Sequence, residues 1–181
     1  MIDIIDIVPA PVIWITGLSG AGKSSTARAL QKLLSDAGVR STILDGDELR
    51  ECLGAEDAVS RPDRVRLGLT YGRLANLLAN QGHVVIVATI SLFNEVFCWN
   101  RQNIPVYFDV FLETPIHELR SRDTKGIYGG FDAGRIQSVA GLDMEVDFPV
   151  DASLVVKFRS GRSAIDVAKI IFDHLKGIYE N

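Results

Sequence analysis

The chain of 181 residues lacks most features of secreted, membrane and metal-binding proteins. Its only two cysteines, Cys52 and Cys98, are far apart and lack metal-ligand spacing, so we expect reduced thiols. Apolar runs such as Val84 to Ala88 are far shorter than the about 20 residues of a membrane span. The first ten residues are apolar but acidic, whereas a secretory signal begins with basic residues. We therefore expect a cytoplasmic protein without membrane contact.

An excess of basic charge is also missing. The formal net charge is −4, which argues against a nucleic-acid-binding protein. The hydrophobic share of 47% and the charged share of 23% are ordinary for a globular protein, so we expect one domain over residues 1–181.

Apolar segments alternate with helical patterns along the chain, which is typical of a parallel sheet covered by helices. The expected helices extend to residue 37, from 60 to 80 and over 163–175, and the expected strands are 11–16, 41–44, 83–89, 106–112 and 154–156.

One segment, Arg120 to Gln137, breaks this alternation because it is basic, rich in glycine and without clear apolar periodicity. Such a composition is typical of a mobile lid over phosphates, and a solvated surface loop is the alternative. We place the lid segment at about residues 120–148.

The strongest motif lies between the first expected strand and the first expected helix. It reads GLSGAGKS and matches the P-loop pattern G-x-x-x-x-G-K-[ST]. In such a loop backbone N–H groups surround the phosphates, Lys23 lies near the β- and γ-phosphates, and the Ser24 hydroxyl binds Mg²⁺. A glycine-rich turn without ligand is the alternative, but the flanking strand and helix favour ATP and Mg²⁺ as cofactors. The predicted ATP-binding residues are Gly17, Leu18, Ser19, Gly20, Ala21, Gly22, Lys23, Ser24 and Ser25.

A P-loop alone does not separate kinases from other nucleotide hydrolases. The chain has no N-K-x-D motif of GTPases, and the strand VVIVAT does not end in the aspartate of motor and transporter ATPases. A short domain with a basic insertion favours a small-molecule kinase. The predicted fold class is α/β, a three-layer P-loop nucleotide-kinase fold with a five-stranded parallel sheet and a lid insertion.

Candidate acceptor residues follow the strand at 41–44, where open α/β sheets bind ligands. Asp45 and Asp47 are candidates to hold a Mg²⁺-bound water or to accept the proton of an attacking hydroxyl. Arg50 is suited to pair with an anionic acceptor or with Asp47. The alternative is that Asp47 caps a short helix and Asp-Gly forms a turn, but the position in the sheet favours a functional role.

Two further residues lie near the same predicted edge. Arg64, at the start of the helix from residue 60, is either an anion contact or a solvated surface arginine. Ser91 follows the strand 83–89, where a lone serine is more often a helix cap.

Taken together, these segments resemble the adenylylsulfate kinase family over nearly the whole chain. The lid signature RDxKGxY combined with the turn LDGDxxR is specific to that family among small P-loop kinases. The matching segments are GLSGAGKS (17–24), LDGDELR (44–50), SRPDR (60–64), ATISLF (88–93), VFLETP (110–115), RDTKGIY (122–128) and GLDMEVDFP (141–149).

The resemblance implies transfer of the ATP γ-phosphate to the 3′-hydroxyl of a small, nucleotide-like acceptor, and it makes a homodimer possible. Ser91 matches a serine described as a phosphoserine intermediate, although direct in-line transfer needs no covalent step. The implied catalytic residues are Lys23, Asp45, Asp47 and Ser91, with Ser24 and Asp45 as metal ligands and Arg122 as a further ATP contact. The implied acceptor-binding residues are Asp47, Arg50, Val59, Arg64, Ile90, Ser91, Lys125 and Val139.

The departures from the family concentrate where it reads the acceptor base. Val59 and Val139 stand where the family has two phenylalanines that sandwich adenine, and residues 67–70 read LGLT where it has N-I-R-R. Base–aromatic stacking contributes about 1–3 kcal/mol per ring, so adenine recognition is weakened unless another group substitutes. Phe93 and Phe148 are candidate replacements. Intact phosphate-handling residues beside altered base-reading residues predict a changed acceptor.

Four functions stay open at this point. The leading one is an ATP-dependent kinase acting on adenylylsulfate or a related activated nucleotide. A pyrimidine acceptor such as cytidine diphosphoramidate, used in surface-polysaccharide pathways, is the first alternative. A kinase for a small sugar or acid ranks next. A non-catalytic ATP-binding subunit is the last, and Asp45 and Asp47 argue against it because a sensor needs no acceptor base.

Overall fold

Residues 9–179 are described by a computed structural model. The strands are β1 (Val12–Thr16), β2 (Ser41–Asp45), β3 (Val84–Thr89), β4 (Tyr107–Glu113) and β5 (Leu154–Lys157). The helices are α1 (Lys23–Asp36), α2 (Gly46–Cys52), α3 (Arg61–Ala79), α4 (Asn94–Asn103), α5 (Ile116–Arg122), α6 (Ile127–Asp132) and α7 (Ala164–Tyr179).

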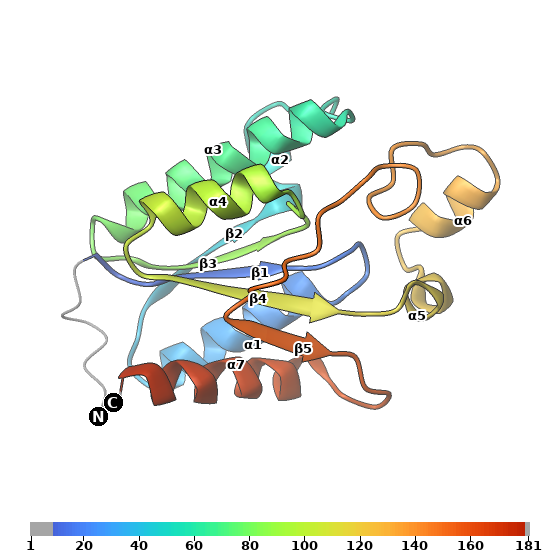
Figure 1. The fold of residues 1–181 in the computed structure, drawn as a ribbon. Helices are drawn as coiled ribbons and strands as arrows, with labels where there is room; N and C mark the ends of the chain where they lie inside the picture. The colour runs from blue at the N-terminus through green and yellow to red at the C-terminus, as the bar shows by residue number, and fades with distance from the viewer. Residues whose placement is uncertain (1–8, 180–181) are drawn as a thin grey trace.

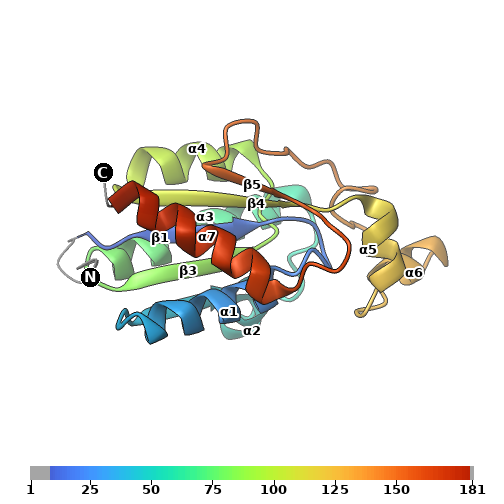
Figure 2. The same ribbon diagram turned by 90° about the horizontal axis from the view of Figure 1, so that it is seen from below.

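The five strands form one parallel sheet in the order β2-β3-β1-β4-β5 (Figure 1). Helices α3 and α4 cover one face and α1 and α7 cover the other, so the fold has three layers (Figures 1 and 2). This confirms the predicted α/β class and the five-stranded parallel sheet.

The central strand β1 explains why both faces are covered. Every residue of VIWIT is buried, and its side chains alternate between two cores. Ile13 and Ile15 pack into the layer with α1 and α7, whereas Val12 and Trp14 pack into the layer with α3 and α4. A strand that is apolar on both faces requires a helix layer on each side. Trp14 is therefore a core residue.

Two short helices, α5 at the entry to the lid segment and α6 within it, are absent from the helices predicted from sequence. Helix α5 ends at Arg122, and α6 begins after Gly126, whose φ of +64° is in the left-handed region. The Asp123 carboxylate accepts hydrogen bonds from the N–H groups of Tyr128, at 3.2 Å, and Gly129, at 2.8 Å. Local capping determines α6, which at six residues is too short for apolar periodicity to reveal.

The carboxyl ends of β1, β2 and β3 lie at the same edge of the sheet, and the segments after them contribute the residues described next (Figure 1). Among the described residues, no helix is both long and apolar enough to cross a bilayer.

Candidate active site

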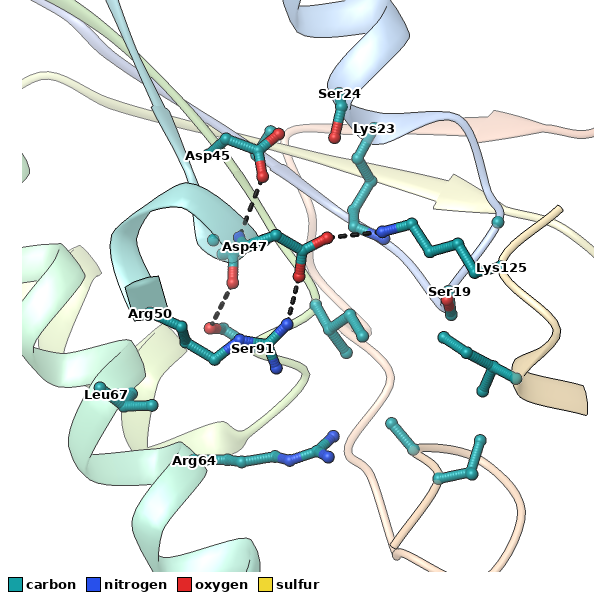
Figure 3. Close-up of a pocket in the computed structure, with 18 of the residues that line it drawn as sticks. Ser19, Lys23, Ser24, Asp45, Asp47, Arg50, Arg64, Leu67, Ser91 and Lys125 are labelled. Carbon is teal, nitrogen blue, oxygen red and sulfur yellow. Dashed lines mark hydrogen bonds and ion pairs between the residues drawn. The ribbon is translucent and has the colours of Figure 1, made fainter. Parts of the chain in front are cut away.

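A cavity of about 380 Å³ lies at this edge of the sheet, and Figure 3 shows many of the residues that line it. Residues of the P-loop, α2, α3, the loop after β3 and the lid segment all contribute to it. Five parts of the chain that are distant in sequence therefore meet at one site.

The P-loop connects β1 to α1 with the backbone conformation that its glycines allow. Gly17, Gly20 and Gly22 have φ values of +155°, +78° and +92°. A Cβ on Gly17 would lie 2.9 Å from the Leu112 carbonyl oxygen, so no larger residue fits there. No side chain caps the first turn of α1, which leaves backbone N–H groups for an anion.

The Lys23 side chain is folded into the P-loop. Its Nζ donates to the Leu18 carbonyl oxygen at 2.8 Å. Burial and the nearby Lys125 ammonium lower the pKa of Lys23 to about 8, against the opposing effect of Asp47 and Asp45. The charged form of Lys23 is therefore strongly stabilised when a phosphate group binds beside it.

Asp45 ends β2 and caps α2. One of its oxygens accepts a hydrogen bond from the Asp47 N–H at 3.0 Å, and the residue is only 6% exposed. The alternative that Asp47 caps this helix was therefore wrong, because the N-cap of α2 is Asp45. Gly46, the first residue of α2, lets the helix start pack closely against the end of β3. A Cβ at this position would lie 2.9 Å from the Thr89 hydroxyl oxygen.

Asp47 lies between two cations. Its carboxylate accepts from Arg50, one turn further along α2, and from Lys125 of the lid segment (Figure 3). Burial alone would raise the pKa of Asp47, but the hydrogen bond and charge of Lys125, with Arg50 and Lys23, lower it overall. The side chain is therefore a carboxylate at neutral pH.

Arg64 is a half-buried cation without a protein partner for its Nε atom. Burial and the charge of Arg50 lower its pKa, although Asp143 opposes this. The neighbouring acid Asp63 pairs instead with Arg66. The guanidinium points into the cavity (Figure 3). Such a group suits an anionic ligand.

Ser91 is buried in the cavity wall after β3. Its hydroxyl lies 3.0 Å from that of Thr89, and its φ of +25° is unusual for a residue other than glycine. Gly68 makes room for it, because a Cβ there would lie 3.1 Å from the Ser91 hydroxyl oxygen. The helix-cap alternative for Ser91 was wrong, since Phe93 occupies the N-cap of α4. The adjacent Ile90 also lines the cavity.

The predicted base-reading positions divide into two groups. Val139 is buried and lines the cavity, whereas Val59 is 54% exposed and is not among the lining residues. Of the candidate replacement rings, Phe93 lines the cavity and is 1% exposed. Phe148 instead lies against Phe111, with ring centroids 5.7 Å apart, outside this cavity. The wall at Val139 is thus aliphatic.

Arg122 lies away from the cavity lining. Its guanidinium carbon is 4.5 Å from the centroid of the Phe158 ring, beside a second, apolar cavity of about 800 Å³ that Phe158 and Leu18 help to line. The lid segment is tied to the P-loop by Tyr128, whose hydroxyl donates to the Ser19 carbonyl oxygen at 2.9 Å. Sequence reasoning did not assign Tyr128 a role, although it ends the lid signature.

The two predicted metal ligands, Ser24 and Asp45, both line the cavity, so their side chains can be compared with the ligands that Mg²⁺ prefers. Within the described residues, no cluster of three or more His, Cys, Asp or Glu side chains forms a complete metal site. Mg²⁺ commonly takes one or two protein ligands and completes its shell with water and nucleotide phosphates. One hydroxyl and one carboxylate fit that pattern.

The comparison with known proteins agrees with this geometry. Residues 10–157 match the family described as adenylylsulphate kinase. The chain belongs to that family. A relative from Campylobacter jejuni subsp. jejuni serotype O:2, a cytidine diphosphoramidate kinase, is 41% identical over 145 residues, which are 80% of this chain and 84% of the relative. An adenylyl-sulfate kinase of Pseudomonas aeruginosa is 36% identical over 162 residues, or 88% and 83% of the two chains.

A solved adenylylsulphate kinase structure supports the fold. The Mycobacterium tuberculosis APS kinase CysC in complex with AMPPNP and APS has a TM-score of 0.85 and 34% identity, over 92% of this chain and 97% of that chain. The protein is thus an ATP-using phosphotransferase of the adenylylsulphate kinase type, acting on an alcohol group.

Proposed function

We propose that this adenylylsulphate kinase family member transfers the γ-phosphate of Mg²⁺-ATP to the 3′-hydroxyl of an activated nucleotide. The proposal rests on one observation: Lys23 of the P-loop and the carboxylates Asp45 and Asp47 line the same cavity. A phosphate donor and an acceptor hydroxyl both require a place in such a site.

On the donor side, P-loop N–H groups and Lys23 bind the β- and γ-phosphates. Ser24 and one Asp45 oxygen would hold Mg²⁺, which neutralises developing charge on the phosphates. Lys125 and Arg122 are the lid cations assigned to the triphosphate nucleotide. Lys125 reaches the catalytic edge directly, because it contacts Asp47. Phe158 lines the second cavity and Arg122 lies over the Phe158 ring, which supports donor-base binding there.

On the acceptor side, Asp45 and Asp47 orient the hydroxyl and accept its proton, while Arg64 and Arg50 hold the anionic group of the acceptor. Support comes from the unpartnered Nε of Arg64 and from the ion pair that leaves Arg50 beside Asp47. Transfer through a loose transition state depends mainly on this positioning and on electrostatic stabilisation. Ser91 lines the wall and needs no covalent role.

A pyrimidine acceptor of the cytidine diphosphoramidate kind is favoured over adenylylsulfate. The cavity wall has aliphatic Val139 and Leu67 on the acceptor side. The aromatic lining residues Phe93 and Tyr71 are only 1% and 3% exposed, so they offer little ring surface for stacking a purine. A smaller pyrimidine depends less on stacking area. Adenylylsulfate is the second candidate, because relatives of nearly equal similarity are adenylyl-sulfate kinases.

ADP release in Mg²⁺ buffer with each acceptor tests the proposal. We expect release that depends on the acceptor and a higher kcat/KM with cytidine diphosphoramidate than with adenylylsulfate. The Lys23→Ala variant is the negative control and should lose orders of magnitude in rate. A higher kcat/KM with adenylylsulfate would contradict the pyrimidine preference. ADP release that is the same with and without each acceptor would exclude both nucleotides as acceptors.

A further inference from the structure

Three charged side chains join separate parts of the acceptor wall just outside the cavity. Arg61, the first residue of α3, donates to both oxygens of Glu95 on α4, at 2.8 and 3.2 Å. The same guanidinium donates to Asp147, near the end of the lid segment, at 3.0 Å. We call Arg61, Glu95 and Asp147 the wall cluster.

Backbone hydrogen bonds connect the wall cluster to the loop after β3. The Asn94 N–H donates to the Asp147 carboxylate at 2.9 Å, and the Asp147 N–H donates to the Leu92 carbonyl oxygen at 2.8 Å. Between these two bonds lies Phe93, whose ring centroid is 5.1 Å from the guanidinium carbon of Arg61. The cluster therefore holds a residue that lines the cavity from behind.

The same cluster reaches the other acceptor residues through short lengths of backbone. Arg64 follows Arg61 by one helical turn, so the first turn of α3 presents one arginine to the cluster and another to the cavity. Val139 begins the segment that ends at Asp147. This segment is braced at its start by Asp143, whose carboxylate accepts from the Val139 N–H at 2.6 Å. Three segments that line the acceptor half are thus connected, directly or through short lengths of backbone, to one guanidinium.

Simple stabilisation does not account for this arrangement. A single exposed ion pair contributes little to the free energy of unfolding. Here the Arg61 guanidinium makes two hydrogen bonds to Glu95, pairs with Asp147 and lies over the Phe93 ring. Together these contacts fix the orientation of the three partners as well as their distances from Arg61. The hydrogen bond from Arg61 lowers the pKa of Glu95, so the pairing persists in mildly acidic solution.

We propose that the wall cluster is a positioning device that sets the shape of the acceptor half of the cavity without touching the ATP half. Arg61, Glu95 and Asp147 act through Phe93, Arg64 and Val139, and none of the three lines the cavity. The inference rests on the proposed function in one respect, because it takes this half of the cavity as the acceptor site.

Kinetics of Arg61→Gln, with Arg61→Lys and Glu95→Gln beside it, test the proposal. With whichever acceptor the wild type uses, Arg61→Gln should raise the acceptor KM about 10- to 100-fold, while the ATP KM stays within about twofold. Arg61→Lys keeps the positive charge but cannot make both hydrogen bonds to Glu95, so its acceptor KM should lie between those of the wild type and Arg61→Gln. The control is Lys32→Gln, which removes an exposed pair with Asp36 on α1. Equal rises in both KM values, or none, would overturn the proposal.

Amide hydrogen exchange provides a second readout that needs no acceptor. In Arg61→Gln the N–H groups of Asn94 and Asp147 should exchange about tenfold faster, while those of the first turn of α1 stay unchanged. Unchanged exchange at both residues would overturn the positioning role even for an active enzyme. Conversely, if the wild-type protein is inactive with both acceptors but Arg61→Gln still produces this change in exchange, only the proposed function is contradicted. Should Arg61→Gln fail to fold, Glu95→Gln gives the same comparison.

Discussion

The Lys125 ammonium donates to the Asp47 carboxylate across 78 residues of sequence and connects the lid segment to the acceptor edge of the sheet. Asp47 also accepts from Arg50, so this carboxylate is neutralised by two cations. A γ-phosphate beside Lys23 would compete with Asp47 for Lys125. Nucleotide binding would thereby free the carboxylate for the acceptor hydroxyl, which links the donor and acceptor halves of the proposed mechanism.

Replacing Lys125 tests that link. Lys125→Met should lower kcat by about 10²- to 10³-fold, because a cation is lost from the charge-rich transition state. The matched control is Arg135→Met, which removes another lid cation that is exposed and not among the cavity-lining residues. Steady-state kinetics with saturating ATP measure the effect. If the two variants have the same kcat, Lys125 does not act on the phosphates.

Asp45 is expected to serve catalysis rather than nucleotide affinity alone. Asp45→Asn keeps an oxygen that can still cap α2 but removes the negative charge. We expect kcat to fall by about 10²- to 10⁴-fold with ATP still bound, as measured by turnover and by calorimetry. A variant that transfers phosphate at the wild-type rate would remove Asp45 from the mechanism.

The half-buried Lys23 makes ATP binding dependent on pH. Its pKa is about 8 in the free protein, and triphosphate charge beside it must raise that value. Binding therefore takes up protons, and the affinity for ATP should fall as the pH rises above about 8. Calorimetry in buffers of different ionisation enthalpy measures the uptake. Lys23→Met should abolish it, and proton release by the wild type would show that the sign is wrong.

Arg64 and Arg66 provide a matched pair for the acceptor site. Arg64 points into the cavity, whereas Arg66, two residues further along the same helix, is exposed and paired with Asp63. Arg64→Gln should raise the acceptor KM by about 10- to 100-fold, because a charge-assisted hydrogen bond is lost. Arg66→Gln should leave it unchanged. Equal effects in acceptor-dependent kinetics would contradict an anion site at Arg64.

Restoring an aromatic ring tests base recognition. Val139→Phe should improve kcat/KM for adenylylsulfate by roughly 5- to 150-fold, the equivalent of one stacking contact. The comparison is Val59→Phe, at an exposed position that is not among the cavity-lining residues, which should change little. Competing acceptor substrates in one assay give the ratio directly. A larger gain from Val59→Phe would place the base elsewhere.

Much of this fold could be predicted because its signals are strong and local. The buried strand β1, the glycine pattern of the P-loop and the apolar faces of α1, α3 and α7 each have a direct physical reading in sequence. The same holds for Asp45 and Asp47, since the carboxyl ends of parallel strands meet at one edge.

The remainder depends on contacts between distant residues. No local pattern shows that Lys125 contacts Asp47, that Tyr128 reaches Ser19, or that Arg61 bridges two carboxylates. Val59 and Val139 look equivalent in sequence, but the fold buries only Val139 in the cavity. Side-chain direction in the folded chain, rather than residue type, decides where these residues lie.

The most direct test of phosphate transfer to a nucleotide hydroxyl is ³¹P NMR of the reaction products. Protein, ATP and Mg²⁺ are mixed with cytidine diphosphoramidate and, separately, with adenylylsulfate. The account predicts a new phosphomonoester signal, coupled to the ribose H3′ proton, that grows as ADP forms and is absent with Lys23→Ala. ADP accompanied only by inorganic phosphate in both reactions would contradict it.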